Sequence, residues 1–422
     1  QVGKTYILDK FARENYRQYL YINMTHVSGE EFLKCLDQAT LWQPGMPRLD
    51  KPLHEAFHLF ENKFMDGKET VVVIDEIQES SRVYSLIRQF AREFQCHFIV
   101  TGSYLGKTVE QGYFLPAGDT EELRMDTLSF PEFLGAVGAR ELYESIDLYG
   151  GDRHDHYDIL KKWYQIYCTI GGYPAVIKRY LETGDMKACE DELYQVIRIF
   201  IEESIRYFDN ILDMNLFDQL FPAIAQLSVK EKKGSGDIIT ELSNLIYKEE
   251  SNRAAKQSIN HAIAWLYRSD IIGYCGKALE CDPTDVRLNM RFYFRDLGVA
   301  RYFLKKGIIR GVAAEGYINE NFVYIDLIKR IERMEIGGTS PVFGTYKDGE
   351  IDFLVSSLQS EYDYGVEVKA GRSEAKTAKK LLDDGKVEAV YFLKGDTYGG
   401  IEGRKITVPI YLTGRVRFDY MR

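Results

Sequence analysis

A short apolar run that ends in two carboxylates constrains the fold of this chain more than any other feature. Residues 70–74 read Thr-Val-Val-Val-Ile and are followed by Asp75 and Glu76. A continuous β-branched run suits a strand buried on both faces, as in a parallel sheet covered by helices. Open α/β sheets bind ligands outside the carboxyl ends of their strands, which is where these two carboxylates would lie. The run therefore predicts an α/β domain with a ligand site at this edge.

The first residues match the second half of a phosphate-binding loop of the form GxxxxGK[ST]. Gly3, Lys4 and Thr5 stand at the start of a helical run. Backbone amides near Gly3 would hold phosphate oxygens at the helix N-terminus, where the helix dipole also favours an anion. Lys4 would reach the β- and γ-phosphates of ATP, and the Thr5 hydroxyl would bind Mg²⁺. The first glycine of the motif and its preceding strand would have to come before Gln1.

The strand ends supply the remaining parts of such a site. Asp75 would hold the Mg²⁺ shell, and Glu76 would polarise the attacking water. A further strand, residues 98–101, is followed by Gly102 and Ser103. We expect Ser103 or Thr101 to sense the γ-phosphate. The sequence thus predicts a P-loop nucleotide site that takes ATP and Mg²⁺.

Three segments carry a family resemblance: residues 75–78 (Asp-Glu-Ile-Gln), residues 101–103 (Thr-Gly-Ser) and residues 127–134 (Thr-Leu-Ser-Phe-Pro-Glu-Phe-Leu). Together they resemble the bacterial and archaeal AAA-like ATPases that are known simply as ATP-binding proteins. Residues 171–174, a Gly-Gly-Tyr-Pro turn, also recur in that family, and we interpret them as a tight structural turn. The resemblance implies a Gly-Arg pair upstream of residue 127, but this chain has Gly118-Asp119 there, so no arginine finger is assigned.

An HExxH motif offers an alternative chemistry. His54, Glu55 and His58 would place two imidazoles and a general base on one helical face, as in zinc peptidases. However, Phe57 and Phe60 mark the segment as an ordinary amphipathic helix beside the sheet. We therefore favour the structural interpretation.

The middle of the chain is helical, and part of it has the pattern of a winged helix. A helix over 238–247, with Asp237 as its cap, precedes a second helix capped by Ser251 or Asn252. The second helix carries an apolar stripe and a polar side that includes Arg253 and Lys256. A strand pair follows from residue 271, so the second helix could read DNA in a major groove, or the segment could serve as a spacer between proteins.

The last third contains a D-x(n)-ExK pattern. Residues 350–355 alternate, with Asp352 on the charged face, and Glu367 and Lys369 share a face of the next strand. Two carboxylates on adjacent strands can hold one divalent cation that activates water, and a lysine can stabilise the oxyanion. The pattern resembles PD-(D/E)xK nucleases, and this resemblance implies a further glutamate from a preceding helix: Glu320, with Glu315 as second choice. The segment at residues 292–298 resembles the one that introduces this domain in the family.

Composition limits the remaining expectations. The net charge is −10 and the pI about 5.4, so binding to nucleic acid would depend on a local basic patch. Six scattered cysteines indicate a reduced, cytoplasmic protein, and neither a membrane segment nor a signal peptide is expected. We predict an α/β protein with a P-loop ATPase domain (1–135), a helical and winged-helix region (136–285) and a restriction-endonuclease-like domain (286–422). Its partners would be ATP and nucleic acid, with a protein partner or a second copy as further candidates. The alternatives are a nucleotide-regulated switch and a DNA-binding regulator, both without nuclease activity.

Overall fold

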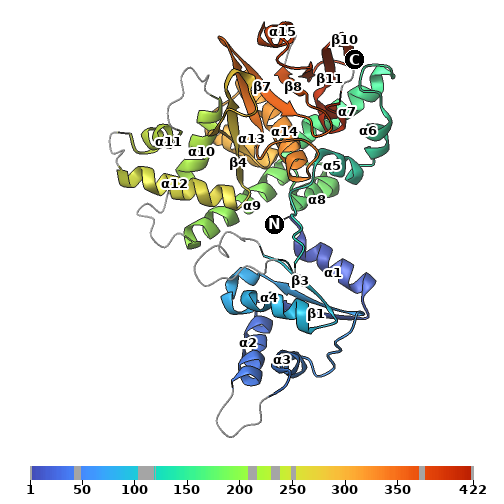
Figure 1. The fold of residues 1–422 in the computed structure, drawn as a ribbon, viewed down its shortest axis with the longest axis vertical. Coiled ribbons are helices and arrows are strands. Elements are labelled where there is room, and N and C mark those ends of the chain that lie inside the picture. The colour runs from blue at the N-terminus through green and yellow to red at the C-terminus, as the bar shows by residue number, and fades with distance from the viewer. Residues whose placement is uncertain are drawn as a thin grey trace. The chain divides into compact units, whose positions relative to one another are not determined.

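The computed structural model describes residues 2–41, 49–102, 118, 120–207, 216–229, 238–248, 253–369 and 376–419, apart from the side chains of 203–207, 289 and 369. The chain forms two compact units, Gln1–Asp126 and Thr127–Arg422 (Figure 1). No helix within these described ranges is long and apolar enough to cross a membrane. The two units are described separately below.

The N-terminal unit contains a parallel sheet, of which the described residues contribute three strands in the order β1-β2-β3. Asn23 of β1 pairs with Asp75 of β2, so the two strands end side by side. The predicted run at residues 70–74 is the fully buried central strand, which confirms the interpretation of its pattern. The elements are α1 (Lys4–Asn15), β1 (Gln18–Asn23), α2 (Val27–Thr40), α3 (Pro52–Phe60), β2 (Thr70–Asp75), the 3₁₀ turn η1 (Ile77–Glu79), α4 (Ser81–Glu93) and β3 (His97–Val100).

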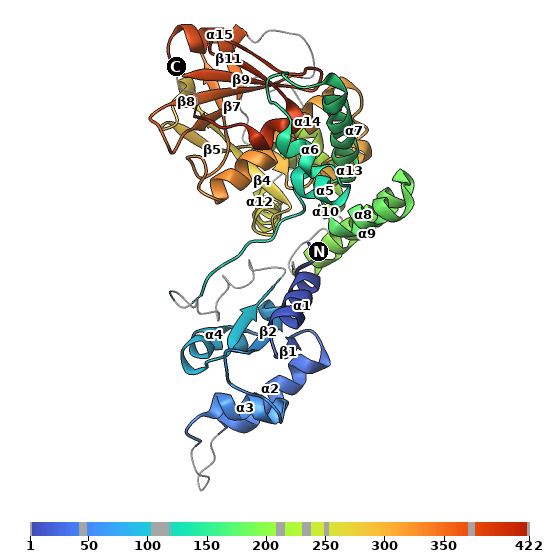
Figure 2. The ribbon, with the colours of Figure 1, turned by 90° about the vertical axis from the view of Figure 1, so that its right-hand side faces the viewer.

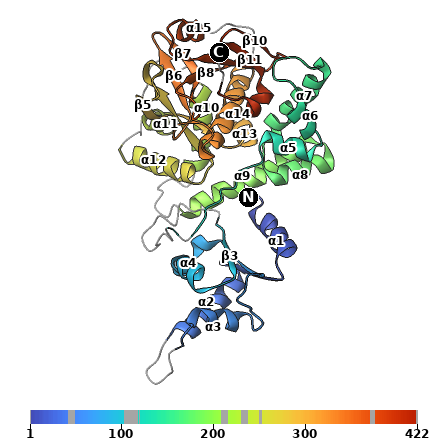
Figure 3. The same ribbon diagram turned by 45° about the vertical axis from the view of Figure 1, so that its right-hand side comes forward.

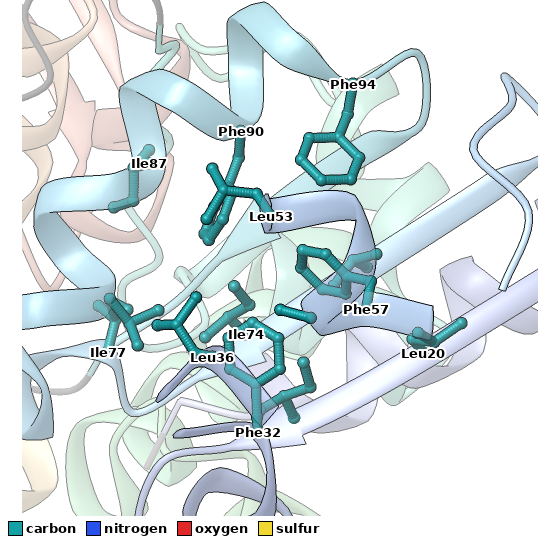
Figure 4. Packing of buried hydrophobic residues seen from close by; sticks show 14 of the residues in the cluster. Leu20, Phe32, Leu36, Leu53, Phe57, Ile74, Ile77, Ile87, Phe90 and Phe94 are labelled. Atoms are coloured by element: carbon teal, nitrogen blue, oxygen red, sulfur yellow. The ribbon is translucent and has the colours of Figure 1, made fainter. Parts of the chain in front are cut away.

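A cluster of aromatic rings fills the space between one face of this sheet and helices α2, α3 and α4 (Figure 4). Phe32 and Phe57 have ring centroids 4.9 Å apart, and Phe57 and Phe90 have centroids 5.7 Å apart. All three are fully buried, and each contributes about 2 kcal/mol through the hydrophobic effect. On the opposite face, Ala12 of α1 packs against Val71 and Val73. Helices on both faces hold β2 rigid, which fixes the position of its carboxyl end.

The C-terminal unit is built on a mixed sheet, whose described strands follow the order β10-β11-β9-β8-β7-β6-β4-β5. Strand β7 runs antiparallel to its neighbours β6 and β8, and β9 and β11 continue parallel to β8. Helix α14 packs on β5 and β8, while α15 packs on β7 and β9 (Figure 2). The strands are β4 (Ile272–Ala278), β5 (Val286–Phe294), β6 (Val342–Tyr346), β7 (Gly349–Ser356), β8 (Asp363–Lys369), β9 (Ala389–Lys394), β10 (Gly400–Glu402) and β11 (Lys405–Pro409).

Helices surround the rest of this sheet. Helix α7 contacts α5, α9, α13 and the 3₁₀ segment η5, which in turn touches α14 (Figure 3). The helical elements are α5 (Phe130–Ala136), α6 (Arg140–Ser145), α7 (His154–Ile170), α8 (Pro174–Thr183), α9 (Met186–Tyr207), α10 (Leu216–Val229), α11 (Ile238–Tyr247), α12 (Arg253–Arg268), η4 (Leu279–Cys281), α13 (Leu297–Lys306), α14 (Val312–Glu332), α15 (Lys376–Asp383) and η5 (Ile410–Arg415).

Three segments that resemble the family meet at one packing junction. The Gly172 amide donates to Asp296 Oδ2 (2.7 Å), and the Leu128 amide donates to the Gly172 carbonyl (2.8 Å). Asp296 also caps α13 by accepting from the Val299 amide (3.1 Å). A Cβ on Gly172 would lie 2.2 Å from the Leu128 carbonyl oxygen, so only glycine fits there. The Gly-Gly turn therefore has a structural role, as expected from the sequence.

The predicted helix pair is present, but the strands that follow it belong to the large sheet. Helix α11 has the predicted bounds, and the apolar stripe of α12 (Ile259, Ala262, Ile263 and Leu266) is fully buried. The predicted caps Asp237, Ser251 and Asn252 lie outside the described residues. Strands β4 and β5 form the expected antiparallel pair, and β4 also pairs with β6. The structure thus places residues on both sides of position 285 in one sheet, while the winged-helix interpretation remains a prediction.

Candidate functional site

Helix α1 begins where the half-motif predicts. Gly3 has φ of 84°, in the left-handed region that favours glycine, and Lys4 is the first helical residue. No side chain caps this helix start and no acidic residue lies in its first turn. A helix start of this kind is suited to an anion, as at helix N-termini that bind phosphate.

The second half of the P-loop and the end of β2 meet through their side chains. Thr5 Oγ1 donates to Asp75 Oδ2 at 2.9 Å, although the two residues are 70 positions apart. The other Asp75 oxygen, Oδ1, accepts from the Glu76 amide (3.0 Å). A hydroxyl and a carboxylate at this distance are the oxygen ligands that Mg²⁺ prefers, so these residues fit the predicted metal.

Tyr21 is a further partner that the sequence analysis missed. Its hydroxyl donates to Asp75 Oδ2 at 2.7 Å and accepts from the Asn23 amide group at 3.3 Å. Burial, together with the hydrogen bond to Asp75, raises the pKa of Tyr21 to about 12. The phenol therefore stays protonated as a donor. The available signal was the alternation along β1, which places Tyr19, Tyr21 and Asn23 on one face, but the contact with Asp75 depends on the pairing of β1 with β2.

Lys4 extends to the end of β3. Its Nζ donates to the Gly102 carbonyl at 2.8 Å. A Cβ on Gly102 would lie 2.6 Å from Gln78 Oε1, so a side chain at this position would displace the Gln78 amide group. Thr101 is buried, and within the described part of the chain its hydroxyl has no hydrogen-bond partner. Ser103, the preferred phosphate sensor, and Asp119 lie outside the described residues.

Glu76 adopts an unusual backbone conformation. Its φ of 54° places a non-glycine residue in the left-handed region, which costs on the order of 1 kcal/mol. The Gln78 side chain donates to the Glu76 carboxylate, and the Ile77 amide donates to the Thr101 carbonyl at 3.0 Å. Strained residues of this kind concentrate at functional sites, and Glu76 is the residue predicted to polarise the attacking water.

The two histidines of the HExxH motif lie against aromatic residues at the edge of the hydrophobic core. His54 stacks on Phe94 with ring centroids 3.9 Å apart, and its Nε2 contacts Asp66 Oδ2 at 3.0 Å. His58 packs against the ring of Phe64. The described residues contain no group of three or more His, Cys, Asp or Glu side chains that could hold a metal ion. The zinc-peptidase alternative therefore has no support in this unit.

In the C-terminal unit, strand β7 is irregular at Asp352. Leu354 pairs with Val342 and Ile351 with Gly344, so Asp352 and Phe353 lie opposite a single residue of β6. Such a bulge redirects side chains and is frequent next to active sites. Ile351 and Leu354 consequently pack in one hydrophobic cluster beside α15. The predicted strict alternation along this strand was wrong, because the bulge shifts its phase.

The bulge brings Asp352 next to Glu320 of α14. Asp352 Oδ2 accepts from the Val368 amide at 2.7 Å, where the β7–β8 ladder has ended at the pair Phe353–Val366. Burial and the neighbouring Asp352 carboxylate raise the pKa of Glu320 to about 8. Tyr293 donates to Glu320 Oε2 at 3.2 Å. Two of the four predicted nuclease residues are thus close neighbours.

The other two are less directly placed. Glu367 is buried and pairs in register with Phe392, which belongs to the hydrophobic cluster beside α15. Lys369 ends β8, but its side chain is not described. Glu315, the second choice, forms two hydrogen bonds with Arg301 (2.6 and 3.1 Å). Among the described residues, no group of three or more His, Cys, Asp or Glu side chains could hold a metal ion. The metal site of this unit therefore stays a prediction.

Comparison with known proteins supports the assignment of the first unit. Residues 1–134 match the model of a family described as an AAA domain, and residues 161–307 match a domain of unknown function. A Walker-type ATPase of Pyrococcus abyssi is similar at 17% identity and a TM-score of 0.42, over 72% of this chain and 88% of that one. No curated protein matches the chain. The family match supports an AAA-type ATPase-like domain in residues 1–134, while the match to 161–307 carries no functional assignment.

Proposed function

We propose that the N-terminal unit binds ATP with Mg²⁺ and hydrolyses it. The supporting observation is the 2.9 Å hydrogen bond from Thr5 to Asp75, which joins the phosphate-binding and metal-binding halves of a P-loop site. The Lys4 ammonium group, which contacts the Gly102 carbonyl after β3, would move from that carbonyl to the phosphates. Gly3 supplies the left-handed turn that points amides toward them.

Each remaining residue has a distinct role in this proposal. Thr5 and Asp75 would hold Mg²⁺, which neutralises the charge on the phosphates when it is bound. Glu76, held in its strained conformation and contacted by Gln78, would orient the attacking water. Ser103 remains the proposed γ-phosphate sensor.

Nucleotide binding by Lys4→Ala and Glu76→Gln variants tests the proposal. The measurements are calorimetric binding of ATP and release of phosphate, in a protein that carries a complete loop. Lys4→Ala should lose binding, while Glu76→Gln should bind ATP but turn it over at least about 100-fold more slowly. Lys10→Ala is the matched control, because Lys10 lies on the same helix, is exposed and pairs with Glu14 at 3.9 Å. Equal binding by all variants would refute a P-loop site.

A second proposed function concerns the C-terminal unit: metal-dependent cleavage of nucleic acid controlled by the ATPase. It is favoured by the neighbouring carboxylates Asp352 and Glu320 at the bulge. Asp352 and Glu367 would bind the divalent cation, and Lys369 would stabilise the developing charge. If this unit lacks cleavage activity, the alternative functions are a nucleotide-regulated switch and a DNA-binding regulator that acts through α12.

Cleavage of labelled single-stranded and duplex DNA and RNA with Mg²⁺ or Mn²⁺, with and without ATP, distinguishes these functions. Activity that is lost in Asp352→Ala but kept in Asp348→Ala would support the nuclease, since Asp348 is an exposed carboxylate in the turn before β7. An effect of ATP that also requires Lys4 would support coupling. Binding without cleavage, weakened in Arg253→Ala or Lys256→Ala with a smaller salt dependence, would support the regulator.

A further inference from the structure

A cavity of about 510 Å³ lies in the C-terminal unit and is built from residues that neither candidate site uses. Its walls come from the start of α7, the segment just before it, the turn between β9 and β10, and η5. This volume is within the range of sites for small molecules or single side chains. Segments about 240 positions apart along the chain form it, so only the folded unit possesses it.

Two glycines hold the rim of the cavity in a fixed shape. Gly150 and Gly399 have φ of 90° and 108°, in the left-handed region. A Cβ on Gly399 would lie 2.4 Å from the Leu148 carbonyl oxygen, so the two loops touch through their backbones. The Asp147 carboxylate accepts from the Tyr149 and Gly151 amides, both at 2.8 Å. The cavity is therefore preformed and does not need to be ordered by a ligand.

Aromatic rings form much of its wall. His154 stacks on Tyr398 with ring centroids 3.8 Å apart and an interplanar angle of 9°. Tyr149 is partly exposed at the mouth, and Tyr411 is buried at the wall. The faces of tyrosine rings carry negative electrostatic potential and attract organic cations.

The charges of the cavity favour the same kind of ligand. Lys161 pairs with Asp396 at 3.0 Å, so these two charges compensate each other. Asp158, one turn before Lys161 on α7, has no ion pair or hydrogen bond to any described residue. Tyr411 lines the same cavity, and burial and then the Asp158 charge raise the pKa of that phenol. The cavity thus retains one uncompensated negative charge beside aromatic rings, which disfavours nucleotides and other phosphates.

We propose that this cavity binds an ammonium or guanidinium group, with Asp158 as its counter-ion and the tyrosine rings as its walls. The described carboxylates do not form a set suited to a metal ion, which favours an organic cation. The group can belong to a free small molecule or to a lysine or arginine side chain of another protein. The proposal is independent of the nucleotide and nuclease functions.

Calorimetric titration of the full chain tests this proposal with three probes: spermidine, arginine amide, and an acetylated and amidated tripeptide with a central arginine. Asp158→Asn should weaken binding by about tenfold, the usual value of a charge-assisted contact. Asp155→Asn is the matched control, because Asp155 lies on the same helix, pairs with Arg153 and does not line the cavity. His154→Ala, which removes the ring stacked on Tyr398, should also weaken binding. Thermal unfolding of each variant verifies that it is folded.

Each outcome decides the proposal. Saturable binding that is weakened by Asp158→Asn and unchanged by Asp155→Asn would support it. A clear preference for the tripeptide would identify the source as a protein side chain, and equal binding of arginine amide would identify a free small molecule. If no probe binds saturably, or if both aspartate variants lose binding equally, the cavity is not a cation site.

Discussion

Glu320 should make the stability of the C-terminal unit fall as the pH rises through neutrality. Its pKa is raised from 4.5 to about 8 by burial and by Asp352. The folded state therefore binds this proton more tightly than the unfolded chain, and stability is lost as pH rises between the two pKa values. From about pH 5 to about pH 7.5, this single carboxyl should lower the free energy of unfolding by about 3 kcal/mol. Glutamine at this position cannot titrate and removes the effect.

The assay is urea unfolding of wild type and Glu320→Gln across this pH range, followed by tryptophan fluorescence. Two of the three tryptophans, Trp163 and Trp265, lie in the C-terminal unit, so the signal reports mainly on its unfolding. The difference in unfolding free energy between the two proteins should shift by about 3 kcal/mol from the acidic to the alkaline end. Glu335→Gln, which changes an exposed glutamate, should run parallel to wild type. Parallel curves for Glu320→Gln and wild type would show that Glu320 is not perturbed by burial and Asp352.

Three further predictions follow from contacts in the two units. Tyr21→Phe removes the 2.7 Å hydrogen bond to Asp75. Because this bond orients a proposed metal ligand, the variant with bound nucleotide should have a roughly tenfold lower affinity for Mg²⁺. Unchanged Mg²⁺ titrations would contradict this role. Gly172→Ala should destabilise the protein by roughly 1–3 kcal/mol because its Cβ meets the Leu128 carbonyl, whereas Gly316→Ala, in open space on α14, should be neutral or stabilising in thermal unfolding. Burial alone would raise the pKa of Asp66, but amide hydrogen bonds from Cys96 and Gln95 and the contact with His54 lower it. Wild type should therefore lose stability as the pH falls through that lowered pKa. Asp66→Asn should be less stable than wild type at neutral pH and should lack this acid-dependent loss.

Much of the N-terminal unit followed from local patterns. Residues 71–74 are apolar on both faces, which is typical of a strand covered on both sides. Gly3, Lys4 and Thr5 indicated the start of a helix, and α1 begins at Lys4. Tyr21 escaped notice, because an aromatic residue in a strand ordinarily indicates core packing and its contact with Asp75 depends on the pairing of β1 with β2.

In the C-terminal unit, the limit of prediction lay in the sheet register. The predicted strands around Asp352 and Glu367 are present as β7 and β8. The bulge at Asp352 depends on how β7 pairs with β6, and nothing in residues 350–355 signals it. The cavity beside α7 was not predicted for a similar reason, because its lining residues are far apart along the chain and belong to no motif.

The attachment of α12 to the large sheet has a mechanical consequence. The helix runs through a short turn into β4, and β4 is hydrogen-bonded to both β5 and β6, with β7 next in the order. A helix that ends in an isolated hairpin can tilt on its own, but α12 would have to bend the sheet in order to move. A force applied to its exposed polar side would reach β7, the strand that carries Asp352, through two hydrogen-bonded strand pairs, β4–β6 and β6–β7. Because α12 and β7 belong to one hydrogen-bonded sheet, a displacement of α12 would also change the distance between Asp352 and Glu320.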